Sequence, residues 1–494
     1  MEAILTVDPR HEIASVSPLI YGHFLEHFHR IVYGGIYDPQ SSFADRRGFR
    51  KDVIEAMRHI RVPIVRWPGG CFASAYHWQD GVGQERRCTY DKAWRVEEPN
   101  TFGTDEFIEF CRTLGAEPYI CGNAGTGTPE EMSDWVEYCN GNAGKWARLR
   151  MSHGIQEPYG IRFWSIGNEN WGGHEIGAKT ADEFARFVTE TAKMIRRVDG
   201  TVQLVAPSVP DVKWNKALLE SAGEYIDYIA IHIYADPLWR KNDPAPYLRC
   251  VKWSVDPEAL ISRTKDLLRS LGNTRVKIAF DEWNLRGWHH PSSTDPIADM
   301  AARDLNDDNS TYTCADAVYA GCFLNACLRH AGRVGMANFA PIVNCRGAIS
   351  THQDSLILRT TYHVFDLYVS HALPNSLDAS VTCDSFRADD SDVPAVDAAM
   401  TCSGEGRYAL ATVNRHDRLP AQLALRLTSN EVSGTADLWT VTGEKADSFN
   451  DIGHPDDVTL RKTVISWDPA NPRCTLPPHS ANMICFNALP DRKK

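Results

Sequence analysis

Two glutamates lie directly after short apolar runs, where they could support acid–base chemistry. Glu169 follows the run 161–166, and Glu282 follows the run 276–280. Cleaving a glycosidic bond needs two carboxyl groups: one protonates the leaving oxygen, and the other attacks the anomeric carbon or activates water. The alternative is that both are structural glutamates in hydrogen-bonded loops. The asparagine and tryptophan near each glutamate favour catalysis.

One of the two glutamates must act as an acid. At pH 7 its carboxyl group must hold a proton, so its pKa must be raised by burial or by a nearby negative charge. After the first step the same group would work as a base. The residues alone do not say which glutamate is the acid.

Further polar and aromatic residues follow other apolar runs. A sugar pocket needs fixed hydrogen-bonding groups for the hydroxyls and apolar surfaces for the ring. The polar candidates are Glu26, Arg66, His232 and Tyr234, with His23, His27 and Asn123 beside them. The aromatic candidates are Trp67, Trp171, Trp283 and Trp288. Each residue alone is more often structural, so the prediction of a sugar site depends on their convergence at one rim.

A repeated unit of strand and helix would position these residues. Eight short runs rich in β-branched residues cover 19–21, 62–66, 118–121, 161–166, 202–206, 228–233, 276–280 and 334–339. Such alternation predicts parallel βα units, and eight units close a (β/α)8 barrel with its chemistry at the C-terminal strand ends. The α/β alternative, an open doubly wound sheet, is disfavoured because neither a GxGxxG motif nor a Walker loop is present.

The clearest helix is predicted to begin after Thr180. Thr180 and Glu183 match a capping box. Apolar residues from Phe184 to Ile195 then recur at spacings of three and four, which indicates one buried face. Gly200 is a stop signal for this helix.

After about residue 365 the helical patterns vanish and short alternating runs replace them. These runs cover 408–413, 422–427, 436–441, 464–467 and 481–486, with turn-forming residues between them. The pattern predicts an antiparallel, jelly-roll-like β-sandwich. We therefore expect a catalytic barrel over residues 17–365 and a C-terminal sandwich over residues 366–494, joined by the N-terminal strand 1–16.

The charge balance and the cysteines exclude several classes of protein. The 494 residues include 52 Lys+Arg and 64 Asp+Glu, a net charge of −12, so nucleic acids and membrane surfaces are poor partners. No stretch approaches the roughly 18 apolar residues of a membrane helix, and no secretory signal is recognised. The 14 cysteines form no CxxC pair, which predicts reduced thiols in a cytoplasm. Because HExxH is also absent, no metal site is expected.

Five motifs together resemble glycoside hydrolase family 51, the α-L-arabinofuranosidases. This family lies within a clan of barrels whose two catalytic carboxylates end strands four and seven. The motifs are IYGHFLEH at 20–27, RWPGG at 66–70, YHW at 76–78, GNEN at 167–170 and DEWN at 281–284. The resemblance covers essentially the whole chain, and the combination is specific, although GNE alone is shared by the clan.

The resemblance implies a retaining mechanism with Glu169 as acid/base and Glu282 as nucleophile. Glu26 would hold sugar hydroxyls, and Arg66 and Asn168 would support the nucleophile and the 2-hydroxyl. The other expected substrate-binding residues are Cys71, His232, Tyr234, Trp171 and Trp288. Such enzymes are usually intracellular, cofactor-free and multimeric, often hexamers. We therefore expect a cytoplasmic homo-oligomer that acts on an oligosaccharide.

Three positions depart from the family pattern. Cys71 stands where many members carry Asn, and Pro341 where a Gln often closes the sugar subsite. Arg286 stands where a Trp commonly follows the nucleophile, although Trp288 could substitute for it. Because hydrogen-bond pairing decides which substrate is accepted, these departures bear on the sugar more than on the reaction.

The leading hypothesis is removal of terminal non-reducing α-L-arabinofuranosyl residues from arabino-oligosaccharides or arabinoxylan fragments. One alternative is the same machinery acting on another glycoside, such as a β-D-galactofuranoside, a xyloside or a β-glucan. The other alternative is a non-catalytic barrel that binds carbohydrate. The presence of both glutamates with their asparagine neighbours disfavours this last hypothesis.

Overall fold

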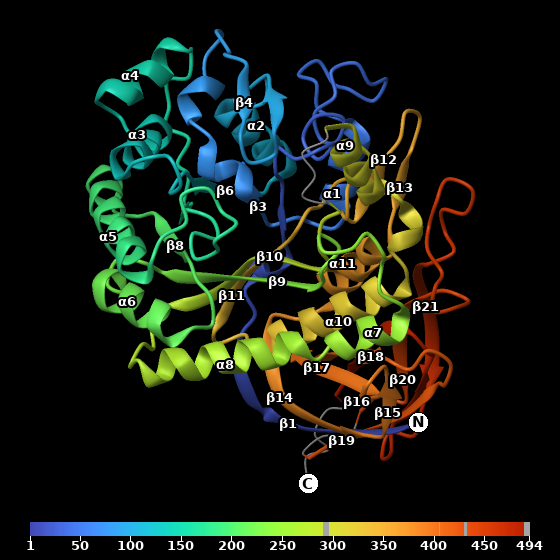
Figure 1. Cartoon of the computed structure of the whole chain (residues 1–494). Helices are drawn as coiled ribbons and strands as arrows, with labels where there is room; N and C mark the ends of the chain where they lie inside the picture. The colour runs from blue at the N-terminus through green and yellow to red at the C-terminus, as the bar shows by residue number, and fades with distance from the viewer. Residues whose placement is uncertain (290–295, 405, 429–431, 489–494) are drawn as a thin grey trace.

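Eight parallel strands close into a barrel (Figure 1). The computed structural model describes residues 1–289, 296–404, 406–428 and 432–488. The strand order around the barrel is β10-β11-β2-β3-β6-β7-β8-β9. The strands are β2 (Gly22–Phe24), β3 (Ile64–Trp67), β6 (Glu117–Gly122), β7 (Phe163–Ile166), β8 (Gln203–Pro207), β9 (Tyr228–Asp236), β10 (Lys277–Arg286) and β11 (Val334–Phe339). The closed ring confirms the predicted (β/α)8 barrel and contradicts the open-sheet alternative.

Two barrel strands differ from their predicted extents. Residues 18–21 form the 3-10 helix η1 (Pro18–Tyr21), so the first strand begins later, at Gly22. Strand β10 continues past the apolar run, so Glu282 lies within the strand and not after it. The register of β10 against β9 shifts between Ala279 and Glu282, as at a β-bulge, which re-aims side chains next to active sites. Buried polar residues then replace the apolar ones, and the strand pattern is lost from the sequence.

Helices follow the strands and cover the outside of the barrel, as Figure 1 shows for α3, α5 and α6. They are α1 (Lys51–His59), α2 (Thr104–Leu114), α3 (Pro129–Asn140), α4 (Lys145–Ser152), α5 (Ala181–Val198), α6 (Val212–Ala222), α7 (Tyr247–Trp253), α8 (Asp256–Ser270), α9 (Pro296–Asp304), α10 (Cys314–Arg329) and α11 (Thr360–His371). Before α5 the Thr180 N–H donates to Glu183 Oε2 at 2.8 Å, and Thr180 Oγ1 accepts from the Glu183 N–H at 3.4 Å. The predicted capping box is therefore confirmed.

The C-terminal part of the chain forms a nine-stranded, mostly antiparallel sheet in the order β21-β20-β23-β18-β17-β14-β1-β19-β22. Its strands are β1 (Glu2–Ser15), β14 (Asn375–Cys383), β17 (Val396–Cys402), β18 (Arg407–Asn414), β19 (Ala421–Leu427), β20 (Thr435–Thr442), β21 (Thr459–Ser466), β22 (Arg473–Leu476) and β23 (Ser480–Asn487). Strand β1 pairs antiparallel with β14 and parallel with β19. The prediction was an antiparallel, jelly-roll-like sandwich. The C-terminal, mostly antiparallel β domain is confirmed, and its nine strands are joined in one sheet.

Helices α10 and α11 contact both the barrel and the C-terminal sheet. Helix α11 reaches the barrel through Phe365, which packs against His23, Trp283 and Phe339. Nearly every residue of α10 is buried, and α11 buries residues 360–365, Leu367 and Tyr368. A helix that is buried on several sides lacks the apolar stripe that marks a surface helix. The expected boundary between residues 365 and 366 falls inside α11 for this reason.

Small elements complete the described chain. Three hairpins pair β4 (Thr89–Asp91) with β5 (Val96–Glu98), β12 (Ile349–Thr351) with β13 (Leu356–Leu358), and β15 (Ser385–Ala388) with β16 (Ser391–Pro394). The remaining 3-10 helices are η2 (Cys71–Ala75), η3 (Trp78–Gly81), η4 (Leu305–Asp307) and η5 (Asn309–Thr311). The first hairpin and η2 both approach Glu26, through Trp94 and Phe72.

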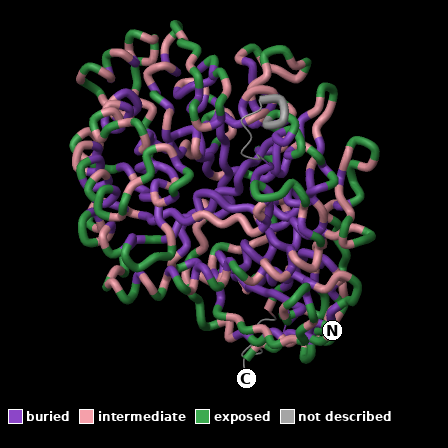
Figure 2. Tube along the Cα trace, in the orientation of Figure 1, coloured by how far each residue is buried: buried purple, intermediate pink, exposed green. Residues whose placement is uncertain are grey.

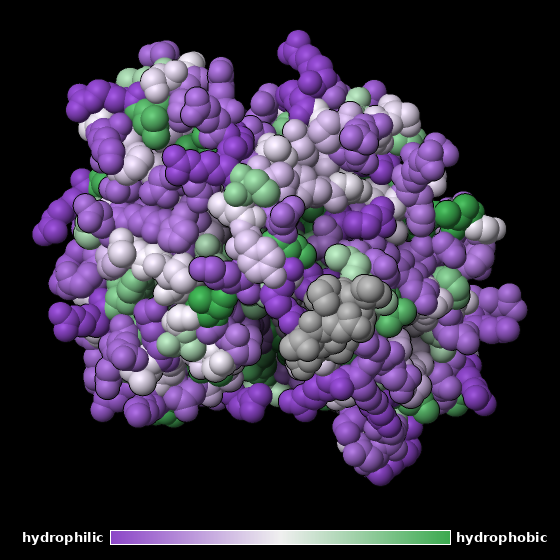
Figure 3. Space-filling view, turned by 45° about the horizontal axis from the view of Figure 1, so that its top comes forward, coloured by the Kyte–Doolittle hydropathy of each residue, from purple (hydrophilic) through white to green (hydrophobic). Residues whose placement is uncertain are grey.

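Burial follows the strands. Figure 2 shows buried residues gathered along the strands in the middle of the molecule and exposed residues on the outer helices and loops. On the face drawn in Figure 3 hydrophilic residues dominate, and hydrophobic residues lie in small separate groups. Among the described residues, no helix is long and apolar enough to cross a membrane. All 14 cysteines lie in the described part of the chain and are free thiols.

Candidate active site

The carboxyl ends of β7, β9 and β10 bring three titratable side chains together. One oxygen of Glu169, one nitrogen of His232 and one oxygen of Glu282 lie within 4.8 Å of one another. Glycosidases that retain the anomeric configuration keep their two carboxyl groups about 5–5.5 Å apart, and inverting enzymes keep them about 6.5–9.5 Å apart. The nearest oxygens of Glu169 and Glu282 therefore have the short spacing of a retaining pair.

A tight turn after β7 carries Glu169 to this point. Gly167 has a φ of 98° and Glu169 a φ of 43°, both in the left-handed region. A Cβ atom on residue 167 would lie 2.1 Å from Asn170 Oδ1 and 2.6 Å from Ala124 Cβ, so only glycine fits there. A residue with a Cβ atom rarely adopts a positive φ, and such strain gathers at functional sites.

Two donors hold the Glu282 carboxylate from opposite sides. Arg66 Nη1 donates to Oε1 at 2.7 Å, and the Tyr234 hydroxyl donates to Oε2 at 2.6 Å. Glu282 is 5% exposed. Hydrogen bonds to a buried charged group are short and strong, so they fix the direction in which the carboxylate points.

A buried acid that sequence reasoning missed lies beside this carboxylate. Asp281 is fully buried, accepts a hydrogen bond from the Tyr119 hydroxyl at 3.0 Å, and forms an ion pair with Arg66 Nε at 3.2 Å. Burial opposes its charge, but Arg66 and His232 outweigh burial and lower the pKa of Asp281. Its position next to Glu282 in the sequence was the available signal.

His232 bridges the acids. Its Nδ1 lies 2.7 Å from Glu169 Oε1, and its Nε2 lies 2.9 Å from Asp281 Oδ1. Ionised carboxylates only accept hydrogen bonds, so both imidazole nitrogens must carry protons when both acids are charged. Burial lowers the pKa of His232, but the charges of Glu282 and Asp281 outweigh burial and raise it well above the usual value. These contacts and charges favour the imidazolium form of His232.

Glu169 is held in its charged form. His174, which sequence reasoning missed, places Nε2 2.7 Å from Glu169 Oε2 on the side opposite His232 Nδ1. Burial would raise the pKa of Glu169, but the hydrogen bonds from His174 and His232 outweigh burial and lower it. This lowering of the Glu169 pKa is opposite to the rise that a general acid needs at pH 7. It suits the later step, in which the group works as a base.

Glu26 faces the site as a buried carboxyl group. Its Oε1 accepts hydrogen bonds from the Phe72 N–H at 3.0 Å and from Trp94 Nε1 at 3.1 Å. Burial, with a smaller contribution from Glu282, raises the pKa of Glu26 to about 8. A Cβ atom on Gly70 would lie 2.6 Å from this oxygen, so a glycine is needed there. Trp94 belongs to the hairpin of β4 and β5, and no sequence pattern marked it.

Four more predicted residues lie around these groups. Asn168 accepts a hydrogen bond from Arg66 Nη2 at 2.8 Å, and its own Nδ2 has no partner within the described chain. Cys71 Sγ lies within 4.8 Å of an oxygen of Glu169. Trp171 is half-buried and contacts the His174 ring edge-on. Trp288 reaches the site through another residue, Arg346.

The Arg346 guanidinium stacks on Trp288 at 3.3 Å and lies over the ring of Tyr234 at 4.3 Å. It is buried, and neither of its Nη atoms has a hydrogen-bond partner among the described residues. Pro341, five residues earlier, has no side-chain donor to offer. The guanidinium therefore brings unused donors close to Tyr234, which holds Glu282.

Several candidates serve the core instead of the site. His23 is fully buried against Phe339 and Phe365, and burial lowers its pKa to about 3. The other candidates in this group are His27, which contacts Glu98 and Trp67, Asn123, which bonds its own loop, and Trp283, which stacks on Phe323. Packing and loop contacts account for these four side chains, because polar and aromatic residues near a strand end also build loops and cores.

Arg286 has a structural explanation. It is buried, with Nη1 2.7 Å from Asp236 Oδ2 and Nε 3.2 Å from Asp316 Oδ1. Asp316 also caps α10 by accepting from the Thr313 N–H at 3.0 Å. The Arg286 side chain therefore connects β10 to β9 and α10, which explains why this position departs from the family pattern.

Replacing Arg286 with methionine is expected to lower the free energy of unfolding by about 3–5 kcal/mol, because two buried carboxylates would lose their partner. Denaturant titration followed by circular dichroism measures this loss. The exposed Arg387→Met on β15 is the control and should change stability by less than about 0.5 kcal/mol. An Arg286 variant as stable as this control, but impaired in substrate binding, would instead assign Arg286 to the sugar site.

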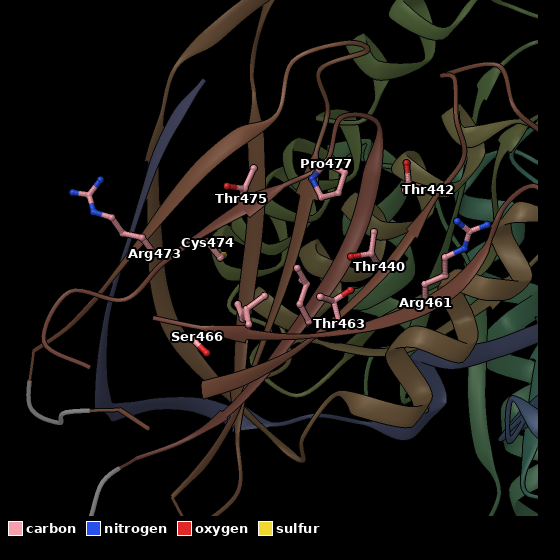
Figure 4. Close-up of a pocket in the computed structure, with 11 residues that line it drawn as sticks. Thr440, Thr442, Arg461, Thr463, Ser466, Arg473, Cys474, Thr475 and Pro477 are labelled. Carbon is pink, nitrogen blue, oxygen red and sulfur yellow. The ribbon is translucent and has the colours of Figure 1, made fainter. Parts of the chain in front are cut away.

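A cavity outside the barrel has the wrong chemistry for glycoside cleavage. It measures about 580 Å³ and lies over the C-terminal sheet, with side chains from β20, β21 and β22 around it (Figure 4). Its lining is rich in threonine and contains Arg461 and Arg473, but no acidic residue and no histidine. This cavity therefore offers no side chain suited to act as the acid or base of glycoside cleavage.

Two family models match most of the chain. Residues 56–249 match the family described as alpha-L-arabinofuranosidase 1 domain. Residues 281–480 match the family described as alpha-L-arabinofuranosidase C-terminal domain. The first match includes Glu169, and the second includes Glu282 and most of the C-terminal sheet.

Named relatives agree with these matches. The chain is 35% identical to the intracellular exo-alpha-(1->5)-L-arabinofuranosidase 1 of Bacillus subtilis, over 86% of this chain and 87% of the relative. It is 32% identical to alpha-L-arabinofuranosidase C of Emericella nidulans, over 98% of this chain and 97% of the relative. The arabinose complex of alpha-L-arabinofuranosidase from Thermotoga maritima superposes with a TM-score of 0.88 at 35% identity, covering 99% of this chain and 100% of that one.

Proposed function

The chain belongs to the family 51 α-L-arabinofuranosidases, and we propose that it removes terminal non-reducing α-L-arabinofuranosyl residues from arabino-oligosaccharides or arabinoxylan fragments by double displacement. It is a glycoside hydrolase that acts on an oligosaccharide substrate. The short spacing of Glu169 and Glu282 carries the proposal of direct attack on the sugar. The name of the Bacillus subtilis relative, an exo-acting enzyme, supports terminal cleavage.

In the first step Glu282 attacks the anomeric carbon. Arg66 and Tyr234 orient its carboxylate by hydrogen bonding. The bond to the leaving oxygen breaks as that oxygen takes a proton from Glu169, and a glycosyl–enzyme ester forms. In the second step Glu169 takes a proton from water, which attacks the ester and releases the sugar with its configuration retained.

The proton of the first step must come from groups next to Glu169. In the described arrangement Glu169 is ionised between His174 and His232. An imidazolium that donates to one carboxylate oxygen at 2.7 Å can transfer its proton there without any other movement of heavy atoms. We infer that the carboxyl group and His174 share one proton, which reaches the leaving oxygen through Glu169.

Sugar hydroxyls are assigned to the unused hydrogen-bonding groups of the site. Glu26 is protonated over much of the neutral range, so it can both donate and accept. Asn168 Nδ2 and both Nη atoms of Arg346 have no hydrogen-bond partner in the described part of the chain, so they supply donors. Cys71, Trp171 and Trp288 complete the proposed walls. Arg346 would thereby compensate for the glutamine that is absent at Pro341.

The reaction is tested with a panel of aryl furanosides and pyranosides, using NMR to identify the first product. We expect the highest kcat/KM with the α-L-arabinofuranoside and release of the α anomer before mutarotation. Release of the β anomer would overturn double displacement. Faster hydrolysis of a β-D-galactofuranoside or a xyloside would favour the alternative sugar, and binding of arabino-oligosaccharide without reducing-sugar release would favour a non-catalytic barrel.

Replacing His174 with glutamine tests the shared proton. Without the imidazole, the pKa of Glu169 should rise, because a hydrogen bond that now lowers it is weakened. The shared proton is then carried by Glu169 alone, without the imidazolium whose pKa Glu169 raises. The alkaline limb of kcat/KM should therefore move to lower pH. His232, Glu175, Glu282, Cys71 and Tyr234 still face this region.

The exposed His11→Ala on β1 is the matched control for His174, and its pH profile should equal that of the wild type. An alkaline limb of His174→Gln that stays in place or moves to higher pH would show that His174 does not supply the Glu169 proton.

We further propose that the protein is cytoplasmic and assembles as a homo-oligomer, a hexamer by resemblance to the family. The relative from Bacillus subtilis that is named intracellular supports the location. The free thiols of all 14 cysteines are consistent with a reducing compartment. Sedimentation velocity measures the assembly, and a mass near 55.3 kDa would overturn the oligomer.

A further inference from the structure

Three potential metal ligands of different chemistry meet beside the reacting groups. Cys71 Sγ, one oxygen of Glu169 and one oxygen of Glu175 lie within 4.8 Å of one another. They come from separate segments: Cys71 begins η2, Glu169 lies in the turn after β7, and Glu175 lies in the loop before α5. The proposed double displacement uses Glu169 as acid and base and assigns no step to Glu175.

Glu175 is a buried acid without a partner. It is 5% exposed, and neither carboxylate oxygen makes a hydrogen bond of normal geometry among the described residues. Burial raises the pKa of Glu175 to about 7, although the nearby Ser74 and Cys71 side chains lower it somewhat. A buried carboxylate without a partner is costly, so this group needs either a proton or a cation.

The Cys71 sulfur, like the Glu175 carboxylate, needs either a proton or a cation. Its thiol is half-buried, and burial together with the nearby charges of Glu175 and Glu26 raises its pKa well above the usual value. The thiolate is therefore disfavoured at neutral pH, which argues against this cysteine as a nucleophile or as a site of easy oxidation. A bound metal ion makes the thiolate favourable, because its positive charge neutralises the sulfur as the proton leaves.

We propose that Cys71, Glu169 and Glu175 bind a thiophilic divalent cation, with Zn²⁺ as the best fit, and that the bound cation inhibits hydrolysis by occupying Glu169. Zinc accepts one sulfur and two carboxylate oxygens, and water completes the tetrahedron. Ligand bonds of about 2.0–2.3 Å set ligand atoms roughly 3.5 Å apart, which small side-chain rotations would reach from the present spacing. Thiolate ligation selects zinc over magnesium and calcium.

The binding step exchanges protons for the metal without any redox change. The thiol of Cys71 releases its proton to solvent and forms the S–Zn bond, and Glu175 releases any proton that it holds. Affinity should therefore rise with pH. The inhibition rests on the proposed role of Glu169 in hydrolysis, whereas the binding does not.

Cobalt(II) tests binding without using activity, because a cobalt–thiolate bond gives an ultraviolet charge-transfer band. We expect this band with the wild type and with Cys88→Ser, which removes the exposed cysteine as a control. Cys71→Ser should lose the band, and both Cys71→Ser and Glu175→Gln should bind Zn²⁺ roughly tenfold more weakly or worse by calorimetry. An unchanged band or an unchanged zinc affinity in Cys71→Ser overturns the site.

Inhibition is then measured for each variant relative to its own activity without metal. Micromolar Zn²⁺ should inhibit the wild type and Cys88→Ser, chelation should restore activity, and Mg²⁺ should have no effect. Glu175→Gln should resist zinc. Equal inhibition of Cys71→Ser would place the cation on the Glu169, His232 and Glu282 group and overturn the proposal. A chain that shows the cobalt band but hydrolyses no glycoside would retain the metal site and refute only the proposed function.

Discussion

Replacing Glu282 with alanine should reduce kcat for aryl α-L-arabinofuranosides by roughly 10⁴-fold or more, on the scale seen when other enzymes lose a nucleophile. No other carboxylate of the described residues is held by both Arg66 and Tyr234, which aim this one group at the sugar. Asp281 cannot replace it, because Asp281 is fully buried and bonded to Tyr119 and His232. Steady-state hydrolysis with a chromogenic leaving group measures the loss.

A small external nucleophile separates loss of attack from loss of fold. With azide present, the Glu282 variant should form a glycosyl azide of inverted configuration, since azide enters on the face that the carboxylate has left. The exposed Glu97→Ala on β5 is the control and should hydrolyse substrate at the wild-type rate. Hydrolysis by Glu282→Ala at more than about one hundredth of the wild-type rate would contradict the assignment.

Replacing Glu169 with alanine should have an effect that depends on the leaving group. With arabino-oligosaccharides kcat/KM should fall by about 10²–10⁴-fold, the usual contribution of a general acid. With a dinitrophenyl leaving group the first step needs no proton, so the glycosyl–enzyme should form rapidly and accumulate. A burst of dinitrophenol followed by slow turnover is the expected observation.

Two further observations check the Glu169 assignment. Azide should restore turnover and give a product of retained configuration, because it replaces water as the second nucleophile. The alkaline limb of the pH profile, which belongs to the acid, should disappear for the activated substrate. An equal loss on substrates with good and poor leaving groups would contradict an acid/base role.

The variants Glu169→Ala and His174→Gln together show where the proton of the Glu169 and His174 pair resides. His174 and His232 hold Glu169 charged, so the first step depends on a proton that these imidazoles can lend. If Glu169 acts as proposed, its variant should lose the pH dependence that His174→Gln only shifts. The structure therefore links one loop histidine to the pH range of the reaction.

Local patterns were sufficient for much of the fold. Seven of the eight β-branched runs fall on barrel strands, and the first run, 19–21, forms η1 directly before β2. The box formed by Thr180 and Glu183 marked the start of α5. These patterns involve residues that are close together in the chain, so they can be recognised in the sequence. The register of β10 and the course of α11 were not readable, because buried polar residues in one and burial on several sides in the other erase the usual period.

Some residues of the site were recognised in the sequence, and others became evident only in the structure. Glu169 and Glu282 were recognised because each follows an apolar run, and family motifs supplied their expected roles. Trp94, Asp281 and Arg346 were missed because their importance lies in contacts with Glu26, Arg66 and Tyr234, far away in the sequence. His174 is five residues from Glu169, yet only the turn of the chain brings its ring back to the carboxylate.

The sequence by itself determined the kind of chemistry: two carboxyl groups at the ends of barrel strands, in a chain too acidic to favour polyanions. Only the tertiary structure decided how those groups are charged and spaced. Charge states depend on burial and on partners such as His174, His232 and Arg66, and spacing depends on strand register and a bulge in β10. These are properties of contacts between distant segments, so the order of residues alone cannot express them.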